Sequence, residues 1–190
     1  MNNRIKFLLI VLVFLIPFII AFMIMDDYTE DKEWDTTNYG KLLNPILNID
    51  NIDLETLDNT ITNTSHFNGK WNLIYSLKKK CDKACLGNIY LLRQVNIALG
   101  KDANRLSRTF MPSTNTSHDS IKNISINYPD LIIINNKPDK IHGLINSFSN
   151  NNSIFLVDPI GNVILMYEDK FEGKKLLKDI KKLFKLSRIG

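Results

Sequence analysis

The chain has 190 residues, with 24 lysines and arginines against 20 aspartates and glutamates, and a formal net charge of +4. This length allows one ordinary domain plus an appendage. The basic excess does not indicate a nucleic-acid partner, because much of it lies in the last twenty residues, where lysines alternate with leucines as on a solvated helix face.

The appendage is an apolar run at residues 7–25, which reads FLLIVLVFLIPFIIAFMIM and contains no charge. A helix of this length covers roughly 28 Å, close to the hydrocarbon thickness of a bilayer. A cleaved signal peptide would have a shorter apolar stretch and small residues at its end, where this chain has Phe22 to Met25. We therefore expect a transmembrane anchor that makes the lipid bilayer a partner of the chain.

The charges that flank the anchor predict its orientation. Arg4 and Lys6 precede the apolar run, whereas Asp26 and Asp27 follow it. The positive-inside rule places residues 1–6 in the cytoplasm and everything after the anchor on the far side of the membrane.

Residues 26–68 follow the anchor without a clear helical or strand-like period. They are acidic and polar at first, and then carry Asn, Thr and Asp with scattered apolar positions. Periodicity does not decide whether part of this segment folds against the domain. We expect an extracytoplasmic tether leading into the domain over 26–68, and a folded domain over 69–190.

The expected domain opens with strand-like and helix-like patterns in alternation. Residues 71–77 have the apolar and aromatic bias of a strand. A helix is predicted from Cys81 to Leu99, because apolar residues recur at helical spacing at 85, 86, 89, 92, 95 and 99. Gly100 lies just past its end, where a C-terminal cap belongs. Residues 106–111 predict a second strand.

The rest of the domain continues this alternation. A polar stretch at 113–129 has room for a short helix, and the continuous apolar run at 131–134 is typical of a central strand buried on both faces. The remaining expected elements are a short helix at 140–148, strands at 153–157 and 162–167 joined by a turn, and a final helix from about 171 to 186.

This order of elements is typical of a thioredoxin-like α/β fold. A mixed sheet covered by helices on both faces would bury these apolar runs efficiently. The expected fold is therefore a thioredoxin-like three-layer sandwich with a mixed sheet, preceded by one N-terminal transmembrane helix.

The only two cysteines, Cys81 and Cys85, are spaced C-x-x-x-C at the expected strand-to-helix turn. On a helix, such positions share a face, with their Cα atoms about 6 Å apart, within the range that a disulfide closes. The helix N-terminus and the neighbouring lysines favour a thiolate there. These cysteines are the candidate catalytic residues.

Three interpretations of the pair stay open. A structural disulfide would suit an oxidising compartment, although its small loop would restrain the unfolded chain little. A redox couple would exchange electrons with partner proteins. A soft-metal site would hold Cu(I) on Cys81 and Cys85 with a further ligand, for which His142 is the best candidate among the three histidines. A structural zinc site would need about four ligands, which this chain does not gather.

Several motifs resemble the Sco/SenC proteins. They are the strand that begins at Gly69-Lys70-Trp71, the cysteine turn, and the stretch FLVDPIGN at 155–162. Sco/SenC proteins are membrane-tethered thioredoxin-like domains that help deliver copper to cytochrome c oxidase. The stretch at 90–101 and the ending at 178–190 are similar to a shorter bacterial branch encoded beside cytochrome oxidase genes. The resemblance covers approximately residues 69–190.

The resemblance implies an assembly factor for cytochrome c oxidase that handles copper or reduces copper-site thiols. It implies a cytochrome c oxidase subunit, or another copper or thiol protein, as partner. It also implies a bacterial inner membrane with the C-terminal domain in the periplasm. The alternatives are a non-catalytic interaction module with a structural disulfide and a general thiol–disulfide oxidoreductase.

Two positions depart from the family pattern. Asp82 follows the first cysteine where Sco proteins usually have proline, and Asn150 stands where they place a copper-binding histidine. An amide is a poor Cu(I) ligand. The family's functional residues therefore carry over only to Cys81 and Cys85.

Overall fold

The computed structural model describes residues 2–26, 37–57, 61–63, 69–135, 140–187 and 189. The chain forms two compact units, Met1–Thr37 and Asn38–Gly190. The first unit holds helix α1 (Asn3–Asp26), which contains Pro17. Its segment Asn3–Met23 is long and apolar enough to cross a membrane. The apolar run expected to form an anchor is thus helical.

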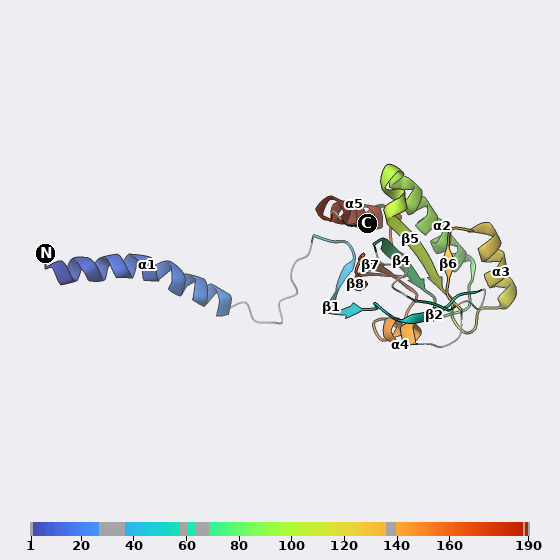
Figure 1. Cartoon of the computed structure of the whole chain (residues 1–190), viewed down its shortest axis with the longest axis horizontal. Helices are drawn as coiled ribbons and strands as arrows, with labels where there is room; N and C mark the ends of the chain where they lie inside the picture. The colour runs from blue at the N-terminus through green and yellow to red at the C-terminus, as the bar shows by residue number, and fades with distance from the viewer. Residues whose placement is uncertain are drawn as a thin grey trace. The chain divides into compact units, whose positions relative to one another are not determined.

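The second unit is built on a six-stranded mixed sheet (Figure 1). In spatial order its strands are β1 (Lys41–Asn48), β8 (Asn162–Glu168), β7 (Ser153–Val157), β4 (Trp71–Ser76), β5 (Leu106–Met111) and β6 (Ile132–Ile133). β4, β5 and β6 are parallel, whereas β7 is antiparallel to β4 and to β8, and β1 is antiparallel to β8. The predicted mixed sheet is confirmed.

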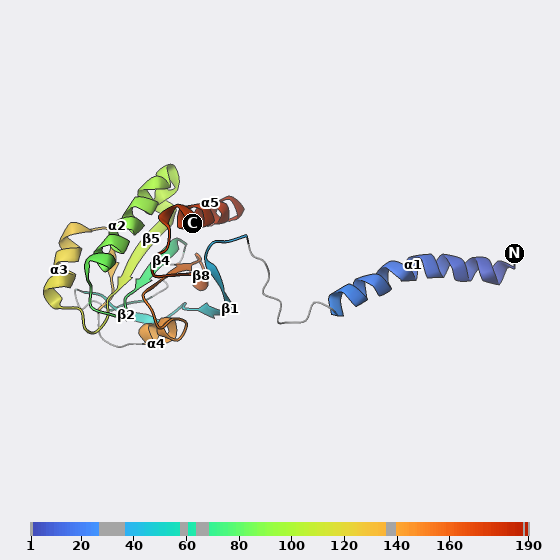
Figure 2. The same cartoon turned by 180° about the vertical axis from the view of Figure 1, so that it is seen from behind.

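Helices cover both faces of this sheet, which confirms the predicted three-layer sandwich. They are α2 (Lys83–Ala98), α3 (His118–Asn127), α4 (Lys140–Asn146) and α5 (Gly173–Leu186), with a 3₁₀-helix η2 (Gly100–Arg105) after α2. α2, α3 and α5 contribute to one hydrophobic core, and α4 contributes to the other. Figure 2 shows α2 and α4 on opposite sides of the sheet.

The alternating side chains of β4 explain the two cores. Leu73 and Tyr75 point into the core under α2, and Ile74 points into the core under α4. α5 packs on the first core through Leu176 and Ile180, which are four residues apart on one helix face and fully buried. The lysines on the other face of α5 stay exposed, as the sequence predicts.

The turn between β7 and β8 forms a hairpin, as predicted. The Asp158 carboxylate accepts the N–H groups of Ile160, at 3.0 Å, and Asn162, at 2.8 Å. Gly161 has φ of +89°, a left-handed conformation that glycine adopts at little cost. A side chain there would also crowd the backbone of Asp50 at 3.1 Å.

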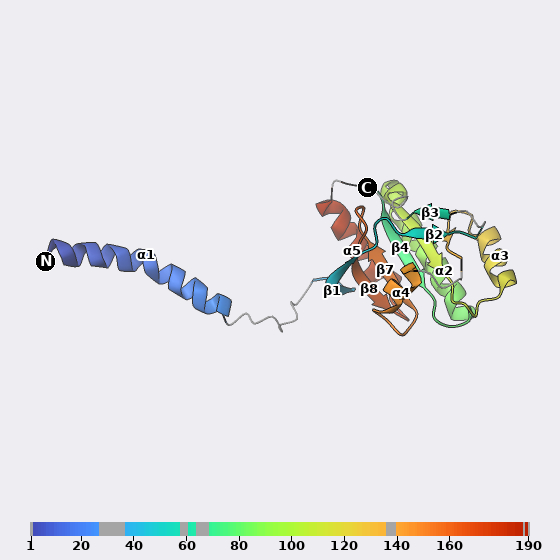
Figure 3. The same ribbon diagram turned by 60° about the horizontal axis from the view of Figure 1, so that its bottom comes forward.

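The apolar run at 131–134 is not a central strand, and that prediction is wrong. It forms only the short β6 at an edge of the sheet. Its outer side is covered by the segment that follows β2 (Asp53–Glu55), because Thr56 bridges Ile134 and the Leu57 N–H donates to the Ile133 carbonyl at 3.2 Å. Three of the four residues of the run are therefore buried, although β6 has one neighbour in the sheet. β2 itself pairs with β3 (Ile61–Asn63) in a small separate sheet (Figure 3).

The opposite edge of the sheet is β1. This strand has a register shift between Leu42 and Leu47, around Pro45, which has no N–H to offer a further strand. The compact unit thus starts at Asn38, within the segment 26–68 that was expected to be a tether leading into the domain. β1 and β2 carry several exposed or half-buried side chains, so they lack the strong apolar pattern of the inner strands.

Asp179 fixes the first residues of this unit to α5. Its buried carboxylate accepts the N–H groups of Tyr39 and Gly40, both at 2.9 Å, and the Tyr167 hydroxyl at 2.8 Å. A Cβ atom on Gly40 would lie 2.6 Å from the Tyr167 ring, so only glycine fits this close approach. Burial and the neighbouring carboxylate raise the pKa of Tyr167, which keeps its hydroxyl a donor.

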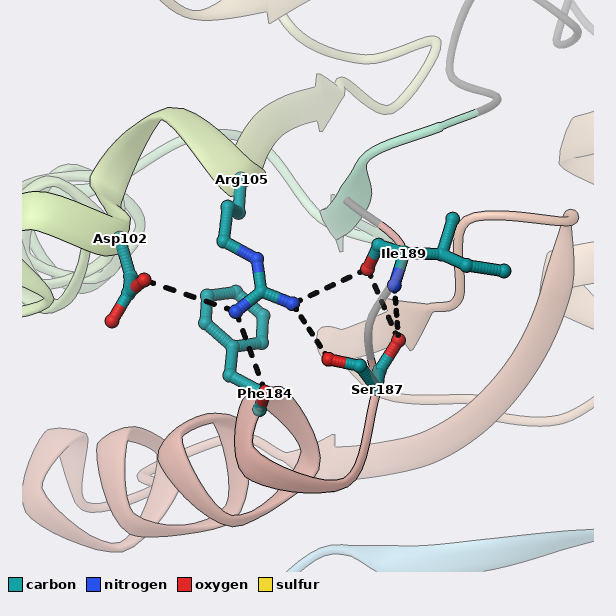
Figure 4. Close-up of polar contacts among 5 residues, drawn as sticks. All are labelled: Asp102, Arg105, Phe184, Ser187 and Ile189. Carbon is teal, nitrogen blue, oxygen red and sulfur yellow. Dashed lines mark hydrogen bonds and ion pairs between the residues drawn. The ribbon is translucent and has the colours of Figure 1, made fainter.

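Arg105 holds the C-terminal end of the chain (Figure 4). Its guanidinium donates to the carbonyl oxygens of Phe184 at 3.4 Å, Ser187 at 3.1 Å and Ile189 at 3.3 Å, and lies 4.3 Å from the centroid of the Phe184 ring. The last carbonyls of a helix have no partner within the helix, and they favour a cation. Arg105 therefore caps α5 and ties it to η2.

Candidate functional site

The cysteines lie where β4 gives way to α2. Asp82 is the N-cap of α2, and its side chain accepts the Cys85 N–H at 3.0 Å, which satisfies one of the N–H groups that a helix start leaves free. The Cα atoms of Cys81 and Cys85 are 5.2 Å apart, and the two sulfurs are joined in a disulfide. The predicted proximity of the pair is confirmed.

The two cysteines differ in exposure. Cys85 is 1% exposed and belongs to the core under α2, beside Ile89. Cys81 is half-buried, packs against the edge of that core and lines a pocket at the surface. A partner can therefore approach Cys81, while Cys85 is covered by the protein.

The loop before the cysteines is fixed on two sides. The Lys78 N–H donates to the Asn152 side chain at 2.9 Å, just before β7. The Ser113 hydroxyl, just after β5, donates to the Lys79 carbonyl at 2.7 Å. The Lys78 ammonium donates to the Asn146 carbonyl at 3.3 Å, and burial lowers its pKa. The cysteine loop is thus held by segments from both neighbouring strands.

A polar network extends from this loop to the core. The Asn152 side chain donates to the Asp169 carboxylate at 3.3 Å, and the same carboxylate accepts from Asn88 on α2 at 3.3 Å. Asn88 also donates to the Tyr75 hydroxyl at 3.2 Å. The sequence offers no signal for these residues, because they are single polar side chains far apart along the chain.

Tyr75 makes the network sensitive to high pH. Burial raises its pKa from 10.0 to about 12; the Asn88 hydrogen bond opposes this shift, and Asp169 and Asp82 add to it. The unfolded chain therefore loses this proton first, so the stabilisation is complete below pH 10 and is lost as the pH rises toward about 12.

We expect the free energy of unfolding of the wild type to fall by about 2 to 3 kcal/mol more than that of Tyr75→Phe across this range. Urea unfolding of both proteins from pH 9 to pH 12 measures the difference. Equal losses in the two proteins would contradict the assignment. The other tyrosines are common to both proteins and cancel in the comparison.

The structure does not bring His142 to the cysteine pair. His142 lies in α4, whose buried neighbours Ile141 and Ile145 belong to the core on the opposite face of the sheet from α2. Within the part of the chain that the structure describes, no three His, Cys, Asp or Glu side chains group as a metal site requires. Asn150 is exposed in the turn before β7, and Asn152 is the residue that reaches the cysteine loop.

A pocket of about 370 Å³ lies between α2 and α3, and Cys81 forms part of its wall. Its other lining residues are Leu86, Arg93, Ser120, Asn123, Ile124, Asn127 and Tyr128. The reactive end of α2 thus borders a groove of mixed polar and apolar character.

A family model described as "Transmembrane-like, thioredoxin-like, C-terminal domain" matches residues 71–187, more than half of the chain. The chain belongs to this family. The matched region of this thioredoxin-like domain runs from β4 to the end of α5 and includes both cysteines. A search of curated proteins finds no match.

Solved structures share the fold of this thioredoxin-like domain. Apo Sco1 from Thermus thermophilus is 17% identical with a TM-score of 0.63, covering 79% of this chain and 99% of its own. Copper-bound ScoI from Arabidopsis thaliana is 14% identical with a TM-score of 0.60, covering 78% of this chain and 99% of its own. BsSco, described through a disulfide switch, is 14% identical with a TM-score of 0.54, covering 77% of this chain and 100% of its own.

These TM-scores show a common fold at low sequence identity. The Sco/SenC resemblance of the sequence is thereby confirmed as a Sco-like thioredoxin fold. The domain places two sulfurs at the start of a helix, and one of them is accessible while the other is buried. This arrangement suits exchange between a dithiol and a disulfide.

Proposed function

We propose that the chain is a membrane-anchored, Sco-like assembly factor for cytochrome c oxidase, which uses Cys81 and Cys85 to keep the copper-site thiols of an oxidase subunit reduced. The observation that carries this proposal is the asymmetric pair at the start of α2, with Cys81 accessible in a groove and Cys85 buried behind it. BsSco, which shares the fold, is described as a member of the Sco family of cytochrome c oxidase assembly proteins.

The charges around α1 support a location for this activity. Arg4 and Lys6 lie at the start of α1, before its apolar run, and acidic residues follow that run, which favours a cytoplasmic N-terminus. In a bacterial inner membrane the thioredoxin-like domain would then work in the periplasm. A target with a disulfide-prone pair of copper-binding cysteines would meet it on that side.

The exchange proceeds in two steps. In the reduced protein the Cys81 thiolate attacks one sulfur of the target disulfide, the target S–S bond breaks, and the released target thiolate takes up a proton. The Cys85 thiolate then attacks the Cys81 sulfur and releases the second target thiol. Two electrons have passed to the target, and the Cys81–Cys85 disulfide of the structure is the end state. A dithiol reductant regenerates the pair.

The position of Cys81 suits it to the first step. It lies just before α2, where helix N–H groups and the lysine run 78–80 stabilise a thiolate. Cys85 is one helical turn further on and covered by the core, so its role is to resolve the intermediate.

Copper transfer is the second candidate function. The ScoI structure from Arabidopsis thaliana, which shares the fold, holds copper. Two thiolates are soft donors that prefer Cu(I). The described residues place no third metal ligand beside the two cysteines. Copper would therefore be bound as cargo, and the partner protein would supply the third ligand.

One anaerobic experiment on the full-length chain in detergent separates these functions. The protein is equilibrated in thiol redox buffers, free thiols are counted, and Cu(I) is titrated in parallel, with Cys81→Ser/Cys85→Ser as control. We expect a reduction potential of roughly −180 to −270 mV, as in exchange-active proteins. Stoichiometric Cu(I) binding that is lost in the control would support the copper function.

A potential below roughly −300 mV without thiol exchange would contradict the redox proposal and leave an interaction module with a structural disulfide. Insulin provides the control for specificity. Rapid reduction of insulin as well as of the oxidase subunit would indicate a general thiol–disulfide oxidoreductase.

A further inference from the structure

The outward face of α2 carries large apolar side chains. Leu86, Tyr90 and Ile97 are 46%, 53% and 56% exposed, and Arg93 is exposed between them. The spacing of four, three and four residues places all four on one side of the helix. A helix side that faces only water is normally polar, so this apolar row beginning next to Cys85 indicates a contact surface.

The pocket between α2 and α3 continues this surface toward the disulfide. Leu86 and Arg93 form its α2 wall together with Cys81, and Ile124 and Tyr128 lie on the opposite wall. α2 and α3 lie side by side in Figures 1 and 2. The volume of about 370 Å³ is that of a small ligand site and accommodates a few side chains of an extended segment.

Among the residues that the structure describes, the guanidinium groups of Arg93 and Arg108 near this groove form no ion pair. Arg93 has no hydrogen bond or ion pair within the described ranges. Arg108 is only 6% exposed, and its Nη1 atom has no hydrogen-bond partner in the same part of the chain. Its neighbours along β5, Leu106 and Phe110, belong to the core under α2 and α3, so Arg108 lies on that face of the sheet.

The surroundings of Arg108 also favour the binding of an anion. Burial lowers its pKa, and the nearby positive charge of Arg93 lowers it further, whereas Asp130 acts in the opposite direction. A buried charge without a bonded partner is costly, and an incoming anion relieves part of that cost. Asp130 is exposed and, among the described residues, makes no ion pair with either arginine. A carboxylate bound at Arg93 would therefore act together with Asp130 to stabilise the positive charge of Arg108.

We infer that the groove between α2 and α3 receives the segment of the target protein that flanks its reactive cysteine, and that Arg93 selects an acidic side chain in that segment. The inference rests on the proposed exchange function. Apolar side chains of the segment pack on Leu86 and Tyr128, and the carboxylate pairs with Arg93. Because Cys81 lines the same groove, the segment delivers its sulfur to Cys81.

Charge-swapped peptides test this inference on the full-length reduced chain in detergent. Two peptides carry one cysteine blocked as a mixed disulfide with 2-mercaptoethanol, and differ only in a Glu or a Lys close to that cysteine. We expect the wild type to react about tenfold faster with the Glu peptide, because a charge-assisted pair forms at Arg93. In Arg93→Glu the ratio of the two rates is expected to invert.

A matched reversal and a neutral reagent complete the test. Lys122→Glu reverses a charge on α3 outside the groove and is expected to keep the wild-type ratio. Each rate is normalised to that of bis(2-hydroxyethyl) disulfide, which has no charge. The preference is expected to weaken with added salt.

Each remaining outcome overturns a distinct statement. A ratio near one in the wild type, or an equal change in Lys122→Glu, overturns the role of Arg93 while exchange with the neutral disulfide keeps the proposed function. No exchange with any disulfide overturns both. Loss of the preference on adding phosphatidylglycerol vesicles would assign the groove to an anionic lipid and overturn the peptide assignment.

Discussion

Replacing Cys81 by serine is expected to slow thiol–disulfide exchange by about 100-fold or more, because the accessible nucleophile is lost. Cys85→Ser is expected to keep the first attack and to stop at a covalent adduct with the target. The physical reason is the difference in exposure, since Cys85 is 1% exposed and Cys81 lines a groove. The two variants differ from each other only in which sulfur remains, so each is the other's control.

Non-reducing gels measure this outcome directly. The reduced variants are mixed with an oxidised target, quenched with acid and alkylated, and the adduct is quantified over time. Adduct formation by Cys81→Ser and not by Cys85→Ser would reverse the assignment of attacking and resolving cysteines. Absence of an adduct with both variants would contradict the exchange mechanism.

Asp179→Ala is expected to lower the free energy of unfolding by about 3 kcal/mol, because three buried or part-buried donors lose their acceptor together. The hydrogen bonds of the Gly40 N–H and the Tyr167 hydroxyl are buried, and that of the Tyr39 N–H is partly buried. Urea unfolding followed by tryptophan fluorescence measures the change.

Tyr167→Phe and Lys181→Ala are the controls for this prediction. The first removes one donor and leaves the two backbone contacts of Asp179, so about 1 kcal/mol is expected. The second alters an exposed residue on α5, and a change within about 0.5 kcal/mol is expected. Equal effects of Asp179→Ala and Lys181→Ala would contradict a special role for the carboxylate.

The inner elements of the fold could be predicted because their buried positions are occupied by apolar residues at a regular spacing. β4 is buried throughout, and α5 repeats its apolar residues at 176, 180 and 184. β1 and β2 escaped prediction because several of their side chains meet solvent, which weakens the apolar pattern. The run at 131–134 misled for a related reason, since residues 56 and 57 cover this edge strand and three of its four residues are buried.

The candidate site shows the same division. Cys81 and Cys85 could be predicted to meet because a spacing of four residues at the start of a helix brings two side chains together. Tyr75, Asn88 and Asp169 could not, because their contacts depend on how β4, α2 and the end of β8 pack in space. Counting from a family pattern singled out Asn150, whereas the folded turn presents Asn152 to the cysteine loop.

The segment ahead of β4 pairs with the two strands, β8 and β6, that would otherwise end the sheet. β1 covers β8, and residues 55–57 cover β6. A copy of the chain shortened to residues 69–190 would bare two ribbons of unpaired amides and carbonyls, which recruit strands from neighbouring molecules. Copies anchored in one membrane meet often, so covering these strands prevents pairing between their sheets. A soluble version of the domain should therefore begin at Asn38.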